Sequence, residues 1–187
     1  CHEIGWNYRL PELSAAFARS QLKRLSHYNA IAQRNGKYLD DAFARIKGMI
    51  PPHTPSGCVT IYHKYRLRFD LQALGINMPN IEFRNKLIQA LQAEGVAATL
   101  WHFRPVPAYP LFQQLDMGYG DGYPWRSPDY NKTIEYNEQD YPETRRMLET
   151  SLIVNNESHP ICNQEMQLME YYVAAFQKVF DHLMPYY

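Results

Sequence analysis

The residues best suited to chemistry stand near the start of the chain, in the turn that begins at Gly5. Gly5 permits backbone conformations that are closed to other residues. The amide of Asn7 can bond a phosphate, or it can act as a turn former that bonds its own backbone. Arg9 suits a carboxylate or phosphate ligand, or a salt bridge at a subunit interface. Tyr8 can line the opening of the same ligand site. These residues form the first candidate site, with both kinds of role left open.

A second set of polar side chains follows the predicted strand 96–101. His102 and Arg104 begin a stretch, 102–140, that is rich in Pro, Gly and Tyr and shows no clear period. An irregular stretch of this length within a compact domain is usually either functional or flexible. Taken alone, a histidine on such a loop is more often structural. Some aromatic residues of the stretch can stack on a sugar or nucleotide: Tyr109, Tyr119, Tyr123 and Trp125. The favoured interpretation is that they belong to ordered protein surface without a ligand.

Composition argues against several other classes of function. Lys+Arg and Asp+Glu both number 19, so the net charge is +0, which disfavours a general binder of nucleic acid or anionic membranes. No segment approaches the roughly 20 apolar residues of a membrane span, and the first residues lack the apolar run of a signal peptide. The cysteines Cys1, Cys58 and Cys162 are far apart and form no Cys-x-x-Cys pair. We therefore expect no metal and a reducing, cytoplasmic location.

Hydrophobic periodicity predicts the elements that must position these residues. Apolar residues at helical spacing predict one long helix or two abutting helices over 12–46, and further helices over about 80–94, 142–150 and 163–183. Strict alternation predicts a half-buried strand over 59–69, with Arg66 and Arg68 on its polar side. Shorter strands are expected at 96–101 and 151–154. Arg145 and Arg146 are expected on a solvated helix face.

The order of these elements predicts an α/β fold, more narrowly a small α+β domain. We expect a small mixed or antiparallel sheet covered on one face by helices, including the long N-terminal helix and the amphipathic C-terminal one.

Five segments in this order resemble the DegT/DnrJ/StrS sugar aminotransferases. The opening stretch from Gly5 to Ala16, with Gln21 and Leu22 behind it, is similar to the family's G-x-N-Y-R-M-x-E-x-x-A-A motif. Tyr62 to Asp70 resembles the strand that opens the family's small domain. The remaining matches are the helix from Phe83 to Gly95, the loop from His102 to Phe112, and the tail from Ser151 to Val179.

The resemblance implies the C-terminal half of a fold-type-I enzyme that depends on pyridoxal 5'-phosphate. Such an enzyme transfers an amino group from glutamate or glutamine to a keto-sugar or cyclitol ketone, and its active site lies between the two subunits of a homodimer. Asn7 is then expected to reach the cofactor phosphate of the other subunit. Tyr8, Arg9, His102 and Arg104 are expected to contact substrate. Pro107 departs from the His or Tyr often found there, which puts one such contact in doubt.

The lysine that carries the cofactor is expected upstream of this chain. No lysine here stands in the family's Ser-x-Lys context, so the chain alone is expected to be inactive, with no catalytic residue of its own. Residues 1–50 are expected to form an opening turn and a long helix that lead from a large cofactor domain, and residues 51–187 the small C-terminal domain. Two alternatives stay open: a free-standing, non-catalytic dimerisation or ligand-binding domain, and a degenerate regulatory member of the family.

Overall fold

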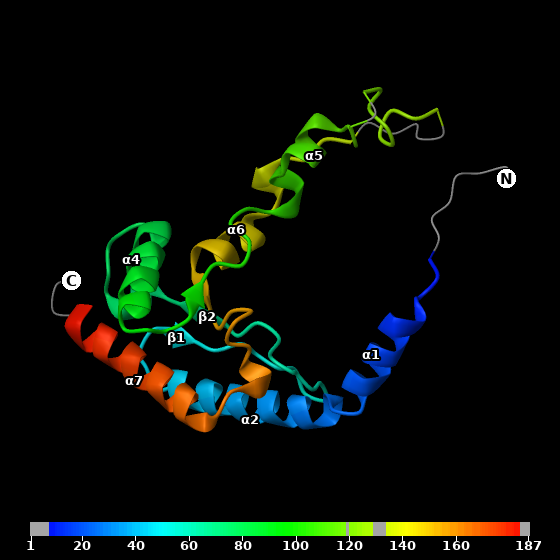
Figure 1. The fold of residues 1–187 in the computed structure, drawn as a ribbon. Helices are drawn as coiled ribbons and strands as arrows, with labels where there is room; N and C mark the ends of the chain where they lie inside the picture. The colour runs from blue at the N-terminus through cyan, green and yellow to red at the C-terminus, as the bar shows by residue number, and fades with distance from the viewer. Residues whose placement is uncertain (1–7, 119, 129–133, 184–187) are drawn as a thin grey trace.

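The fold places helices against one side of a small antiparallel sheet (Figure 1). A computed structural model describes residues 8–118, 120–128 and 134–183. The α-helices are α1 (Glu12–Leu22), α2 (Leu25–Phe43), α3 (Leu71–Leu74), α4 (Asn80–Ala93), α5 (Pro110–Gln114), α6 (Pro142–Glu149) and α7 (Met166–Leu183). The strands are β1 (Met49–Ile50), β2 (Arg66–Phe69), β3 (Ala98–Thr99) and β4 (Ser151–Val154). Short 3-10 helices are η1 (Val106–Ala108), η2 (Glu138–Asp140) and η3 (Ile161–Asn163).

The sheet has the strand order β1-β2-β4-β3, and each neighbouring pair is antiparallel. Arg66 pairs with Ile153 and Arg68 with Ser151 across the two central strands. The predicted α/β class is confirmed, and of the two expected sheet types the antiparallel one is found.

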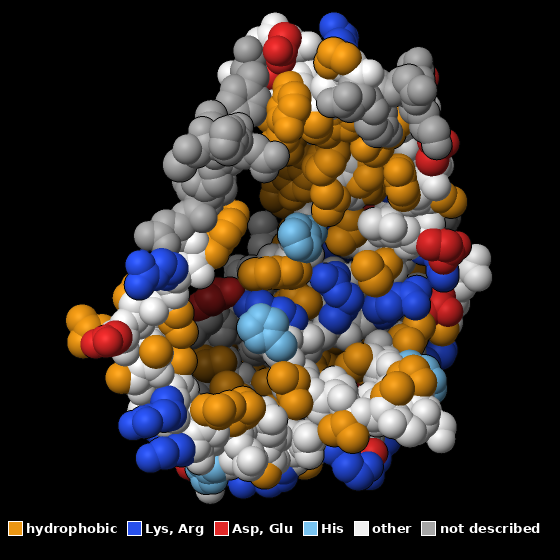
Figure 2. Space-filling model, turned by 90° about the vertical axis from the view of Figure 1, so that its right-hand side faces the viewer, with side chains coloured by type: hydrophobic (Ala, Val, Ile, Leu, Met, Phe, Trp, Pro, Cys, Tyr) orange, Lys and Arg blue, Asp and Glu red, His pale blue; other side chains and the backbone are white. Residues whose placement is uncertain are grey.

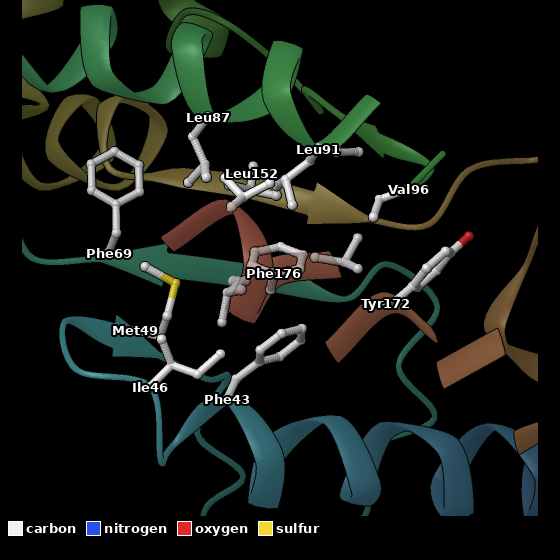
Figure 3. Close-up of a cluster of buried hydrophobic side chains, with 14 of the residues drawn as sticks. Phe43, Ile46, Met49, Phe69, Leu87, Leu91, Val96, Leu152, Tyr172 and Phe176 are labelled. Carbon is white, nitrogen blue, oxygen red and sulfur yellow. The ribbon is translucent and has the colours of Figure 1, made fainter. Parts of the chain in front are cut away.

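Side-chain alternation along β2 separates a core face from an open face. Leu67 and Phe69 are buried in the core together with Leu152 and Val154 of β4. Arg66 and Arg68 alternate with them, so they stand on the opposite side, which we call the open face. Helices α2, α4 and α7 cover the core side (Figures 1 and 3).

Aromatic rings fill the centre of this core. The ring of Phe176 on α7 lies 4.6 Å from that of Phe43 on α2, centroid to centroid, and Phe69 on β2 meets Phe83 on α4 at 5.0 Å. Figure 3 shows Phe43, Phe69 and Phe176 converging with Leu87, Leu91 and Leu152 from the helices and the sheet. Burial of these large apolar groups ties the helices to the sheet.

The strand predicted over 59–69 is shorter in the structure, and it begins only at Arg66. Tyr62 has a φ of 46°, which breaks the extended conformation. The amide of Tyr65 donates to the Asn155 side chain at 2.9 Å instead of to a strand. Pairing with β4 therefore becomes regular only after Tyr65.

The strand predicted over 96–101 is also reduced, to Ala98–Thr99. His102 has a φ of 61°, which turns the chain away from the sheet. Strand β1 and helix α3 were not expected from periodicity because each is too short to show one. Helix α3 is fixed by its ends: the Asp70 carboxylate accepts from the amides of Gln72 and Ala73, and Gly75 closes it at a φ of 77°.

Of the two forms expected for residues 12–46, the structure has two abutting helices, α1 and α2. Helix α2 packs on η3 and α7. Helix α1 has no buried residue. The part of the predicted apolar stripe that lies on α1 is therefore exposed to solvent instead of facing a core: Leu13, Phe17 and Leu22. The domain boundary at residue 50 stays a prediction.

Across the described ranges, no helix is both long and apolar enough to cross a membrane.

Candidate functional site

The surface is hollowed between α1 and the arm that carries α5 (Figures 1 and 2). Figure 2 shows Lys and Arg side chains gathered across the middle of this hollow, with hydrophobic side chains above and below them. A concave surface that combines cations with apolar area is the usual form of a site for a small, anionic or polar ligand.

Arg66 fixes the loop that follows β3 onto the open face. Its guanidinium donates to the Ser151 hydroxyl at 2.8 Å and to the Trp101 carbonyl at 3.2 Å. Burial lowers the pKa of Arg66 from its ordinary value, although the group remains a cation at neutral pH. Arg66 is thus a positioning residue that sets where the chain enters the 102–140 stretch.

Lys64 holds the same loop from its other side. Its ammonium nitrogen lies 4.2 Å from the centre of the Trp101 ring and 2.6 Å from a carboxylate oxygen of Glu157. The bond from Lys64 lowers the pKa of Glu157. A cation over an indole face is attractive, and the ion pair fixes the direction from which the amine approaches.

Two of the predicted site residues, His102 and Arg104, follow directly from this anchored tryptophan. The His102 ring meets the Trp101 ring edge-on at 5.6 Å, and its left-handed backbone marks a sharp bend. The Arg104 guanidinium carbon lies 5.6 Å from the Phe103 ring and 6.0 Å from the Tyr109 ring. Both side chains are exposed and so accessible to a ligand in the hollow.

Two of the other predicted residues, Tyr8 and Arg9, lie before α1, at the end away from α2. Tyr8 and Arg9 are exposed, and Asn7 lies outside the described residues. Within the part of the chain that the structure describes, no hydrogen bond, ion pair or ring contact joins Tyr8 or Arg9 to the loop that carries His102 and Arg104. His102 and Arg104 thus share one loop through their positions in the sequence, and Tyr8 and Arg9 lie on a separate segment before α1.

A cavity of about 450 Å³ opens beside the anchored loop. Its apolar walls come from α2, from the segment before β2 and from the segment around η3, and Trp101 and Lys64 stand at one side. Amide side chains supply polar groups: Asn29, Asn155 and Asn156. A volume of this order suits a small ring-shaped molecule.

A cluster of one carboxylate and two phenols supports the wall of this cavity. Asp40 on α2 accepts from the Tyr62 hydroxyl at 2.5 Å and from the Tyr65 hydroxyl at 2.8 Å. The Tyr62 ring lies so close to α2 that a Cβ added to Gly36 would be 2.3 Å from it. Gly36 therefore makes room for the ring, and burial raises the pKa of Asp40 despite the two hydrogen bonds.

The same cluster makes Tyr62 resist ionisation, because burial and then the neighbouring Asp40 carboxylate raise its pKa to about 12. A group whose pKa is higher in the folded state contributes stability below its unfolded pKa, near 10, and loses it as pH rises through 12. In an alkaline titration, the phenolate absorbance of the wild-type chain minus that of Tyr62→Phe reports the ionisation of Tyr62. The midpoint of this absorbance difference is expected near pH 12. A midpoint near 10 would contradict the Asp40 contact.

The described lysines do not by themselves form a cofactor site. Lys64 is committed to Glu157 and Trp101, and the other described lysines are exposed: Lys23, Lys37, Lys47, Lys86 and Lys178. Lys132 lies outside the described residues. A pyridoxal phosphate site needs a lysine amine that is free to form a Schiff base. An upstream position for that lysine stays a prediction.

Sequence reasoning passed over Lys64, Arg66 and Trp101, which organise the hollow. A signal for the first two was present, since Lys64, Arg66 and Arg68 place three cations at alternate positions on one side of a predicted strand. Like charges at that spacing repel one another unless partners or a ligand compensate them. No comparable signal marked Trp101, because its partners Lys64 and Arg66 lie just before and within β2, more than 30 residues away in the sequence.

The chain is similar in sequence to curated proteins. MosB of Rhizobium meliloti is 25% identical over 182 residues, which are 97% of this chain and 32% of MosB. The chain spans about a third of the length of the curated relatives it matches.

Two solved structures share the fold. Helicobacter pylori PseC, an aminotransferase involved in the biosynthesis of pseudoaminic acid, aligns with a TM-score of 0.64 at 18% identity, over 97% of this chain and 40% of PseC. The PLP form of Spr1654, a putative sugar aminotransferase from Streptococcus pneumoniae, aligns with a TM-score of 0.67 at 18% identity, over 93% of this chain and 36% of that protein. Residues 1–125 match the sequence pattern of one family, and this chain belongs to it: the DegT/DnrJ/EryC1/StrS aminotransferase family.

Proposed function

We propose that the chain is the C-terminal part of a pyridoxal-phosphate-dependent aminotransferase. The complete enzyme transfers an amino group from glutamate or glutamine to a ketone on a sugar or cyclitol. The observation that carries the proposal is the Trp101 loop, which Arg66 and Lys64 fix onto the open face beside a cavity of about 450 Å³. Family membership and the aminotransferase fold support it.

In this proposal the chain supplies binding and orientation, and the missing part of the enzyme supplies the reactive amine. When bound, pyridoxal phosphate supplies the carbonyl group that carries nitrogen from donor to acceptor. Arg104 binds a carboxylate of the amino donor, and His102 lines the acceptor side. Arg66 acts through the loop, because its bond to the Trp101 carbonyl sets the position of both.

The N-terminal arm has its own role in the proposal. Asn7, Tyr8 and Arg9 reach the cofactor phosphate and the substrate of the other subunit of a homodimer. The exposed apolar stripe of α1 supports this arrangement, because such a surface is normally covered in an assembled protein. Free Cys58 and Cys162 support the cytoplasm as the compartment.

The decisive experiment measures 2-oxoglutarate released from glutamate by the complete protein, loaded with pyridoxal phosphate and offered a panel of keto-sugars and cyclitol ketones. Stoichiometric 2-oxoglutarate with at least one acceptor is expected. Arg104→Gln is expected to raise the KM for glutamate by about 10- to 100-fold, because a charge-assisted hydrogen bond contributes about 1.5–3 kcal/mol.

The control is Arg45→Gln, which removes an exposed arginine outside the hollow and is expected to leave KM unchanged. Absence of transfer by the loaded protein from both glutamate and glutamine would overturn the proposal and favour a non-catalytic or regulatory relative. An unchanged KM in Arg104→Gln would remove Arg104 from the donor site.

A further inference from the structure

A second cavity, of about 430 Å³, lies at the other end of β2. It is bounded by the end of β2, helix α3, the first residue of α4 and the end of α6. Its lining does not include Trp101 or any other residue of the cavity beside the anchored loop. Its polar lining residues are Arg68, Asp70, Gln72, Asn80, Arg146 and Thr150.

Arg68 is the group in this cavity that calls for an explanation. Its Nε is inaccessible to solvent and has no hydrogen-bond partner within the described residues. A buried polar N–H without a partner costs about 1–3 kcal/mol, and more when the group is charged. Arg66, two residues earlier on the same face, has two acceptors. Within the described residues, Arg68 thus lines the cavity without acceptors like those that engage Arg66, and its guanidinium charge is left for a ligand. The Nε itself is not the point of contact, because solvent does not reach it.

The remaining charges of the cavity favour an anion. Arg146 is a second cation, paired with Glu143 on the solvent side at 2.5 Å, and its side chain is 59% exposed. Asp70 is the acid in the lining, but one of its oxygens already accepts from two amides at the start of α3. The lining therefore carries two cations against one engaged carboxylate.

The start of α4 adds to this preference. Asn80 is the first residue of this 14-residue helix, and its N-cap, Pro79, has no side-chain hydrogen bond to the helix. The first amides of a helix lack acceptors within the helix, and the helix dipole favours negative charge there. Two guanidinium groups beside a helix N-terminus fit a tetrahedral, multiply charged oxyanion better than a single carboxylate.

We propose that this cavity binds the phosphate group of a small phosphorylated molecule. Arg68 and Arg146 supply the charge, and the Asn80 side chain donates a hydrogen bond. This site is independent of the proposed aminotransferase function, because its residues are separate from the loop and cavity that carry that function.

The test is titration of the 187-residue chain with inorganic phosphate by calorimetry, at an ionic strength held constant with chloride. Saturable binding to one site is expected, and acetate is expected to bind at least about tenfold more weakly. Arg68→Gln is expected to weaken phosphate binding at least about tenfold, since loss of one charge-assisted hydrogen bond costs about 1.5 kcal/mol or more. Arg146→Gln is expected to weaken it in the same direction.

Arg145→Gln is the matched control, because Arg145 is the preceding residue of α6 and does not line the cavity. It should bind phosphate as the wild type does. Asn80→Asp gives a second, independent variant: a carboxylate at a helix N-terminus favours the fold, yet it repels an anion. The far-ultraviolet circular dichroism of each variant reports whether it is folded.

Absence of saturable phosphate binding would overturn the proposal. Equal binding by wild type, Arg68→Gln and Asn80→Asp would also overturn it, since phosphate would then bind elsewhere. Equal affinity for acetate and phosphate would overturn the assignment to a phosphate group.

Discussion

Phe176→Ala is expected to lower the free energy of unfolding by about 3–5 kcal/mol. Phe176 is fully buried on α7, and its ring packs 4.6 Å from the ring of Phe43 on α2. Removing the ring takes away its transfer energy and leaves a cavity where α2, α7 and the sheet meet (Figure 3). The surrounding helices cannot close this space, because α2 is also held by η3 and α7 by α4.

Urea unfolding followed by circular dichroism measures this loss. The control is Phe103→Ala, which removes the same ring from a side chain that is 65% exposed, and its change is expected to stay near 0.5 kcal/mol. Similar losses from both substitutions would show that Phe176 is not part of a tightly packed core.

Asn35→Ala is expected to lower the free energy of unfolding by about 2–3 kcal/mol. Asn35 is fully buried on α2, and its Nδ2 donates to the carbonyls of Ile161 at 3.0 Å and Gln164 at 2.9 Å. These bonds connect α2 to η3 and to the residue that follows it. Without the amide, the buried Ile161 carbonyl has lost its donor, which costs more than the bond itself contributes in net terms.

Asn29→Ala makes the same chemical change on the same helix and serves as the control. Asn29 is partly exposed, so its replacement is expected to change stability by no more than about 0.5 kcal/mol. The comparison is read from the urea midpoints at equal m-value. If the two variants unfold at the same midpoint, the Asn35 bonds contribute nothing measurable.

The long amphipathic helices were predictable from sequence because their evidence is local. Phe43 on α2, Leu87 and Leu91 on α4 and Phe176 on α7 recur at the spacing of a helix face, and each is buried in the structure. Helix α3 was not predicted, although its Asp70 cap and left-handed Gly75 depend only on neighbouring residues.

Strand lengths were not predictable, because a strand exists only where a partner pairs with it. The alternation from Val59 to Phe69 continues beyond the ladder, but Asn155 takes the Tyr65 amide and the ladder starts at Arg66. Similarly, β3 pairs with β4 only at Ala98 and Thr99, although β4 extends further, because the chain turns away at His102. Hydrophobic alternation records which side of a segment is apolar, whereas its hydrogen-bond partners lie far away in the sequence.

The two arginines of β2 show most clearly what the sequence determined and what it left to the tertiary structure. Alternation alone placed Arg66 and Arg68 on the same side of one strand, because side chains alternate with period two whatever surrounds them. Only the fold gave Arg66 the Trp101 carbonyl and the Ser151 hydroxyl, while leaving the Arg68 Nε without an acceptor beside Arg146. These neighbours come from segments more than 30 residues away, and no local pattern in the chain encodes such distances.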